Sequence, residues 1–173
     1  MRNGNHWLLK GAIAGMIGGF VGSWTMNQFQ SGVSKVGKAW EKSAHRPPQP
    51  PRPSSDEAAT ARLARRLSHA LLGRDLTDDE MKIAEPLVHY GFGTFSGGVY
   101  GLLAEIAPTA RKGTGTVFGS SLWLAADEIA VPKLGLSKSS STFGPKVHAE
   151  ALAAHLVYGV TTEEVRRGIR ALL

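Results

Sequence analysis

Trp7 to Phe29, WLLKGAIAGMIGGFVGSWTMNQF, is the stretch that decides the fold. Apart from Lys10 it carries no charge over about 20 residues, the length that an α-helix needs to cross a bilayer. Gly11, Gly15 and Gly19 recur every four residues, so they share one face of a helix. Small residues at this spacing let two helices approach closely inside lipid. The stretch therefore predicts a membrane-spanning helix that packs through its glycines.

Three further segments are apolar over a comparable length, residues 83–107, 114–131 and 147–165. In residues 114–131, Gly115 and Gly119 repeat the small-residue spacing. Only helices or closed barrels can span lipid, and no segment alternates like a barrel strand. We therefore predict an all-α fold: a single membrane domain over 1–173, in which these segments and residues 7–29 form a four-helix transmembrane bundle.

The segment between the first two spans, residues 30–80, has a different composition. It offers a short interfacial helix at Val33–Trp40, a stiff polyproline-like spacer at Arg46–Pro53, and a basic amphipathic helix at Asp56–Leu72 capped by Ser55. A capping box at Thr77–Glu80 starts the next helix. We predict an amphipathic extramembrane insert, which lies on lipid, binds a partner, or simply docks on its own protein.

Two short segments of the apolar helices resemble each other. His89-Tyr90-Gly91-Phe92-Gly93 and His155-Leu156-Val157-Tyr158-Gly159 both have an aromatic residue three positions after the histidine and a glycine four positions after it. Each follows a Gly-rich helix that contains a tryptophan, Trp24 or Trp123. The pattern predicts two helix-pair repeats, with chance similarity of Gly-rich helices as the alternative.

Up-and-down threading of four spans brings most of the ionisable residues of the apolar segments into one half of the bundle. These residues are Glu85, His89, Asp127, Glu128, His148 and His155. Ionisable side chains in a membrane normally face the bundle interior and pair with one another. The expected pairs join His89 or His155 to Asp127 or Glu128.

Three interpretations of this cluster remain open. The first is a proton-responsive site, because histidine titrates near neutrality and carboxylates shift its pKa. The second is a metal site, for which the ligand types are suitable but no HExxH or Glu-x-x-His spacing is present. The third is a set of structural hydrogen bonds that fix helix register. No cofactor is predicted.

Composition and motifs favour a protein that is not an enzyme. The chain has no cysteine, so it has no thiolate nucleophile or disulfide framework. Ser120 and Ser121 lack a nucleophile-elbow context, and Lys112–Gly115 lacks a complete phosphate-binding loop. The net charge of +6 suits an anionic membrane surface, and no nucleic-acid-binding motif is present.

Four segments resemble an uncharacterised bacterial family of small inner-membrane proteins, the YagU-like proteins. They are GAIAGMIGGFVGSWTMNQF from Gly11, HYGFGTFSGGVYGLLAE from His89, SLWLAADEIAVPKLGLS from Ser121, and HLVYG from His155. The resemblance implies a multi-pass protein of the bacterial inner (plasma) membrane and a role in acid resistance, without established catalytic residues. The expected partners are the lipid bilayer and either a homo-oligomer or a larger membrane complex. In the alternative function, the chain is an accessory subunit that packs its Gly-rich faces against such a complex.

Overall fold

The computed structural model describes residues 6–43, 58–138 and 142–173. Every regular element within these residues is a helix, so the predicted all-α class is confirmed. Arg46–Pro53, Ser55 and the expected helix start at Asp56 lie outside the described residues. Among the helices that are described, none combines the length and the apolar character usually required of a membrane span.

The helices differ from the expected segments in two places. Their bounds are α1 His6–Ser43, α2 Ala59–Leu72, α3 Asp78–Ile106, η2 Pro108–Arg111, α4 Thr116–Trp123, η3 Leu124–Ala130, α5 Val131–Lys133 and α6 Pro145–Leu172. First, α1 continues through residues 30–43 as one helix, although a separate interfacial helix was expected at Val33–Trp40. Second, the segment expected as one helix over 114–131 is continuous but contains a π-helix, η3, between α4 and α5.

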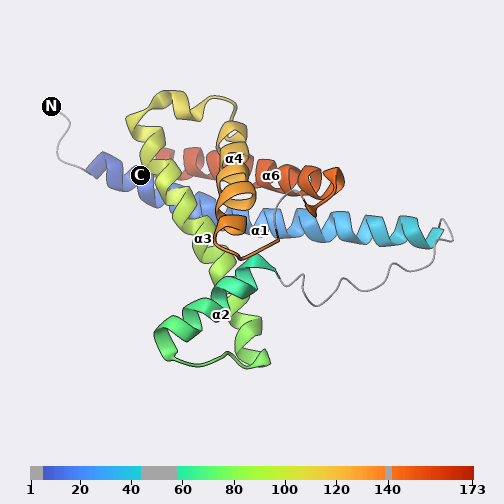
Figure 1. Cartoon of the computed structure of the whole chain (residues 1–173). Coiled ribbons are helices and arrows are strands. Elements are labelled where there is room, and N and C mark those ends of the chain that lie inside the picture. Colours follow the sequence, from blue (N-terminus) through green and yellow to red (C-terminus); the bar gives the residue numbers. More distant parts are fainter. Residues whose placement is uncertain (1–5, 44–57, 139–141) are drawn as a thin grey trace.

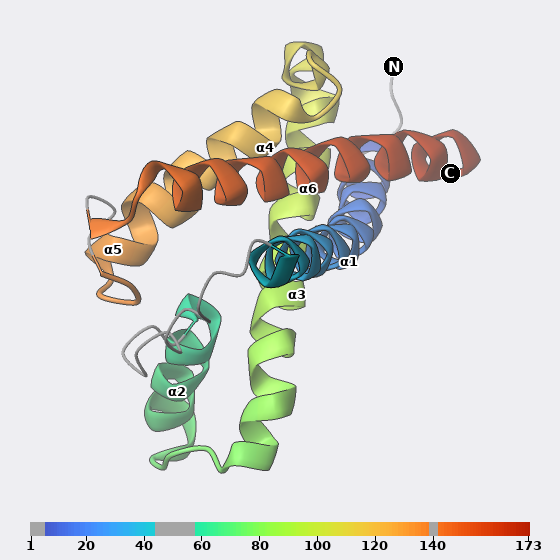
Figure 2. The same ribbon diagram turned by 90° about the vertical axis from the view of Figure 1, so that its right-hand side faces the viewer.

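The long helices cross one another rather than standing side by side (Figure 1). α1 packs against both α3 and α6, and α4 packs on α6. α2 contacts α3, and the second view shows α2 and the adjoining end of α3 projecting away from the place where α3 passes α1 and α6 (Figure 2). The fold is therefore organised around α1, which is in contact with two of the other long helices.

The α1–α3 crossing is a contact between glycine backbones. Gly15 faces Gly97, and a Cβ atom added at Gly97 would lie 2.7 Å from Gly19 Cα and closer still to the Gly15 carbonyl oxygen. Gly11 meets Gly101 and Gly19 meets Gly93 in the same way, so the two helices run antiparallel. Real Cβ atoms do not approach backbone this closely, and only glycine permits the approach.

The α4–α6 crossing repeats this contact. A Cβ atom added at Gly159 would lie 2.8 Å from the Gly119 nitrogen and closer still to the Gly115 carbonyl oxygen. Gly115 and Gly119 therefore occupy the same relation to Gly159 as Gly15 and Gly19 occupy to Gly97. A Cβ atom added at Gly19 would meet the carbonyl oxygen of Gly93, and one added at Gly119 would meet the carbonyl oxygen of His155. The backbone of His155 therefore takes the place of Gly93 in the second crossing. In space, His155 thus corresponds to Gly93, whereas the sequence similarity pairs His155 with His89. The two correspondences differ by one helical turn.

We predict opposite effects for the same substitution at two positions of α3. Gly97→Ala should lower the free energy of unfolding by about 1–3 kcal/mol, because the methyl group forces α1 and α3 apart. Gly91→Ala should raise it by up to about 1 kcal/mol, because an added Cβ atom at Gly91 meets nothing within 4 Å and alanine favours the helix. Thermal unfolding of both variants under identical conditions checks this. Equal stability of the two variants would contradict the close contact.

The connection between α2 and α3 is defined by two capping motifs. Gly73 ends α2 in the left-handed conformation, at φ 67°. Thr77 and Glu80 form the expected capping box at the start of α3. Glu80 also accepts two hydrogen bonds from Arg74, at 2.5 and 2.8 Å. These bonds from Arg74, together with the Thr77 backbone N–H, lower the pKa of Glu80 to about 2.

This pKa gives the α2–α3 connection a defined pH dependence. A carboxyl whose pKa is lowered by folding stabilises the folded form above its unfolded pKa of about 4.3, and the contribution is lost as the pH falls through about 2. Amide protection factors of Glu80 and Met81 should therefore fall between about pH 4 and pH 2. Glu80→Gln should remove this pH dependence, because glutamine can still form the box but does not titrate. Protection factors with the same acid dependence in wild type and E80Q would refute the assignment.

Candidate functional site

A cavity of about 660 Å³ lies between α1, α2, α3, α6 and the segment from α4 to Leu136. Its walls are mostly apolar. Four ionisable side chains line it: Glu85 and His89 from α3, Asp127 from η3, and His155 from α6. No lysine or arginine is among the described residues that line it. The cavity therefore gathers carboxylates and imidazoles from three separate elements.

The π-helix η3 positions the two neighbouring acids. Each π-helical turn contains more residues than an α-helical turn, and such segments often occur at functional sites. Asp127 lines the cavity, where its Oδ2 lies 3.6 Å from His155 Nδ1. Glu128 instead pairs with His148, with 2.7 Å between Oε1 and Nδ1. The two acids thus belong to two different histidine pairs.

His89 has an unpaired nitrogen. Its Nε2 atom is buried and has no hydrogen-bond partner among the described residues. A buried polar atom without a partner costs about 1–3 kcal/mol, so its presence needs an explanation. Because His89 lines the cavity, water or a bound molecule there could supply the partner. His155 differs, because its Nδ1 lies 3.0 Å from the Ala151 carbonyl oxygen as well as near Asp127.

Of the six ionisable residues selected from the sequence, the structure brings four together. Glu85, His89, Asp127 and His155 share the cavity, and Glu85 Oε1 accepts a hydrogen bond from Thr60 of α2 at 3.3 Å. Glu128 and His148 pair with each other outside the set of lining residues. In the described part of the chain, no three His, Cys, Asp or Glu side chains are placed to hold a metal ion together. The geometry therefore gives the metal interpretation no support.

Sequence reasoning missed a second polar cluster, which lies between α3 and α6. Arg166 donates to Glu163 through Nε at 2.6 Å and Nη2 at 2.9 Å, and both residues are only 2% exposed. Tyr100 donates to the same carboxylate at 3.0 Å, and its ring stacks on Phe118 with 4.2 Å between centroids. The i,i+3 spacing of Glu163 and Arg166 was visible in the sequence. The residues around this pair in the chain do not indicate that it is buried, because its burial depends on the packing of α6 against α1 and α3.

This buried pair should be far more important for stability than its exposed neighbour. Removing one partner of a buried ion pair strands the other charge and costs about 3–5 kcal/mol. We expect Glu163→Gln to lower the free energy of unfolding by about that much. Glu164→Gln is the matched control, because Glu164 forms an exposed pair with Arg167 at the same i,i+3 spacing, and should change it by less than about 0.5 kcal/mol. Similar losses in the two variants, measured by thermal unfolding, would show that the buried pair has no special role.

Residues 31–164 match the family described as "Protein of unknown function (DUF1440)". No curated protein and no solved structure matches the chain. The matched range contains all four ionisable residues of the cavity but not Gly11, Gly15 and Gly19, the glycines of α1 that contact α3. The match does not test the more specific resemblance to the YagU-like proteins. Because it covers most of the sequence, the chain belongs to the DUF1440 family.

Proposed function

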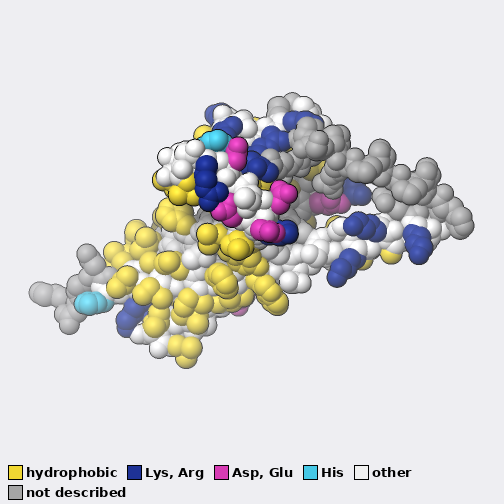
Figure 3. Space-filling view, turned by 90° about the horizontal axis from the view of Figure 1, so that it is seen from below, with side chains coloured by type: hydrophobic (Ala, Val, Ile, Leu, Met, Phe, Trp, Pro, Cys, Tyr) yellow, Lys and Arg dark blue, Asp and Glu magenta, His cyan; other side chains and the backbone are white. Residues whose placement is uncertain are grey.

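We propose that this chain is an integral membrane protein, with α1, α3, the α4–α5 segment and α6 in the bilayer. Because no described helix has the usual length and apolar character of a span, the proposal rests on the arrangement of exposed side chains. Large apolar residues are exposed along α1 and α3: Leu9, Ile13, Met16, Ile17, Phe20, Trp24, Leu87, Phe92, Phe95, Val99, Leu103 and Ile106. Figure 3 shows hydrophobic side chains gathered over one part of the molecule, apart from most of the charged ones. Water-soluble monomers rarely expose a continuous apolar surface of this extent.

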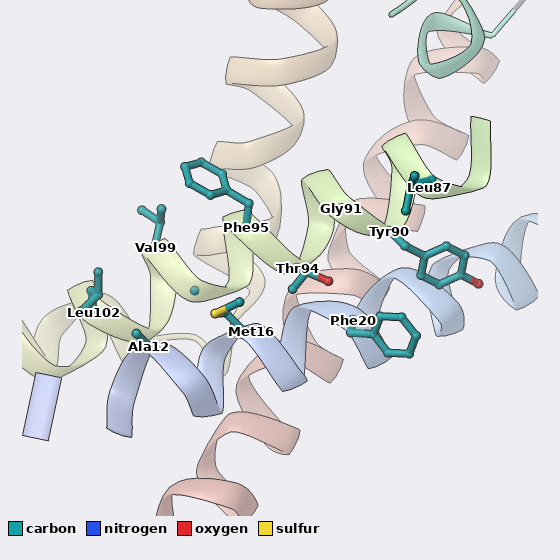
Figure 4. Close-up of a pocket in the computed structure, with 11 residues that line it drawn as sticks. Ala12, Met16, Phe20, Leu87, Tyr90, Gly91, Thr94, Phe95, Val99 and Leu102 are labelled. Carbon is teal, nitrogen blue, oxygen red and sulfur yellow. The ribbon is translucent and has the colours of Figure 1, made fainter. Parts of the chain in front are cut away.

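An open groove between α1 and α3 belongs to the same apolar surface. Met16 and Phe20 line it from α1, and Phe95 and Val99 line it from α3 (Figure 4). Phe95 is 68% exposed, which is unfavourable in water but favourable against acyl chains. The resemblance to the YagU-like proteins supports the bacterial inner membrane as the bilayer concerned.

Within this membrane protein, the cavity is a proton-responsive site that takes up protons from one aqueous side and conducts them across the bilayer. The observation that carries this function is the convergence of Glu85, His89, Asp127 and His155 on one cavity. Histidine is the side chain whose charge changes between about pH 5 and pH 8. Protonation of His155 turns its contact with Asp127 into an ion pair, and protonation of His89 places a positive charge beside the cavity. External acid would thereby change the charge of the site and the forces between three helices.

The accessory-subunit alternative has less support. It relied on free small-residue faces that a partner could contact. Gly11, Gly15 and Gly19 lie against α3, and Gly115 and Gly119 lie against α6. These faces are therefore covered by the chain's own helices, and a partner would need another surface.

Reconstitution in liposomes tests the proton function. The purified chain is inserted into vesicles that contain a pH-sensitive dye, the vesicles are washed at alkaline pH, and proton movement is followed after an acid pulse. We expect His89→Ala, Asp127→Asn and His155→Ala each to reduce the protein-dependent proton movement at least about tenfold, because each removes a titrating group of the cavity. His69→Ala is the control, because His69 pairs with Asp75 on the exposed side of α2. Loss of the protein from washed vesicles, or wild-type proton movement in all three variants, would refute the proposal.

A further inference from the structure

We infer that the same cavity binds an organic cation with an apolar body, and that cation and protons compete for it. This inference rests on the proposed function, because it uses the same four ionisable residues. It adds the chemical class of a ligand and the direction in which pH should change its affinity.

The charge of the cavity favours a cation. When the histidines are neutral, Glu85 and Asp127 give the lining a formal charge of −2, and no lysine or arginine among the described lining residues offsets it. The groups facing it from α1 and α2 include Ser23, Asn27, Gln30 and Thr60, which carry no charge. Isolated charges are costly in an apolar environment, so a cation that neutralises the carboxylates is favoured.

Nearby groups that could oppose a cation already have partners. The guanidinium of Arg66 in α2 donates to the carbonyl oxygens of Leu134, which lines the cavity, and of Gly135. The Tyr158 hydroxyl, which also faces the cavity, donates to the Gly93 carbonyl oxygen at 2.6 Å. Only His89 and His155 can therefore add positive charge to the lining when the pH falls.

The size and walls of the cavity favour an apolar body on that cation. Its volume of about 660 Å³ lies within the range of sites that enclose small organic molecules. The walls include Met26, Leu63, Val88, Phe92, Leu122 and Leu136. The ring of Phe92 can also attract a cation through its negative face. A small hydrated metal ion would leave these apolar walls without contacts.

Competition with protons follows from the same charges. Two protons on His89 and His155 bring the formal charge of the lining from −2 to zero, so they remove the attraction for a cation. Binding of the cation near neutral pH should conversely release protons from the histidines. Low pH should therefore weaken binding, and binding should acidify an unbuffered solution.

Two ions of the same shape and opposite charge test the inference. Tetraphenylphosphonium and tetraphenylborate are titrated into the full-length protein in detergent micelles, with empty micelles as the blank, at about pH 8 and about pH 5.5, which bracket histidine titration. We expect saturable binding of tetraphenylphosphonium at the higher pH, at least about tenfold weaker binding at the lower pH, and proton release on binding. Tetraphenylborate should show no saturable binding. Equal binding of the two ions, or affinity for the cation that does not change with pH, would overturn the inference.

A pair of adjacent variants localises the site. Asp127→Asn should weaken tetraphenylphosphonium binding at least about tenfold, whereas Glu128→Gln should leave it within about twofold, because Glu128 pairs with His148 and does not line the cavity. Wild-type affinity in D127N would refute the assignment. Absence of cation binding in a protein that still moves protons through His89 and His155 would remove this inference and leave the proposed function standing. Absence of both would remove both.

Discussion

Gly15 of α1 and Gly97 of α3 lie so close that neither position has room for a side chain, and the rest of the structure depends on this contact. It fixes where α1 crosses α3, and a second row, Gly18 and Gly22, brings the neighbouring side of α1 against α6. Close backbone approach maximises van der Waals contact between helices without requiring large apolar side chains in the interface. The large apolar side chains of α1 and α3 are then left to face outward. One constraint thus accounts for both the tight interior and the apolar exterior.

The two polar clusters follow from this framework at different levels of α3 and α6. One contains Tyr100, Glu163 and Arg166, whose hydrogen bonds satisfy one another. The other is the cavity, where His89 Nε2 has no partner among the described residues and where the nearest Asp127–His155 atoms are 3.6 Å apart. A satisfied buried network stabilises a single arrangement, whereas an incompletely satisfied one leaves room for water, protons or a ligand. This difference supports a structural role for the first cluster and a functional one for the cavity.

The π-helix η3 links the fold to the candidate site. Within η3, Asp127 lines the cavity beside His155, whereas Glu128 pairs with His148. Adjacent side chains also point in different directions in a regular α-helix. The π-helix instead changes where Asp127 and Glu128 lie around the helix axis relative to the α4–α6 glycine contact. The local widening therefore combines close packing at Gly119 with the presentation of Asp127 a few residues later.

The sequence by itself determined the helical class, the capping box at Thr77 and the glycine spacing, because these depend on residues close together in the chain. It also selected the four ionisable residues that line the cavity, since antiparallel helices place such groups at one level. Only the tertiary structure decided which glycines meet, that Glu163 and Arg166 are buried, and that Asp127 faces the cavity while Glu128 does not. These outcomes depend on crossing positions and on the π-helix of η3. Both arise from packing between segments far apart in the chain, which no local pattern specifies.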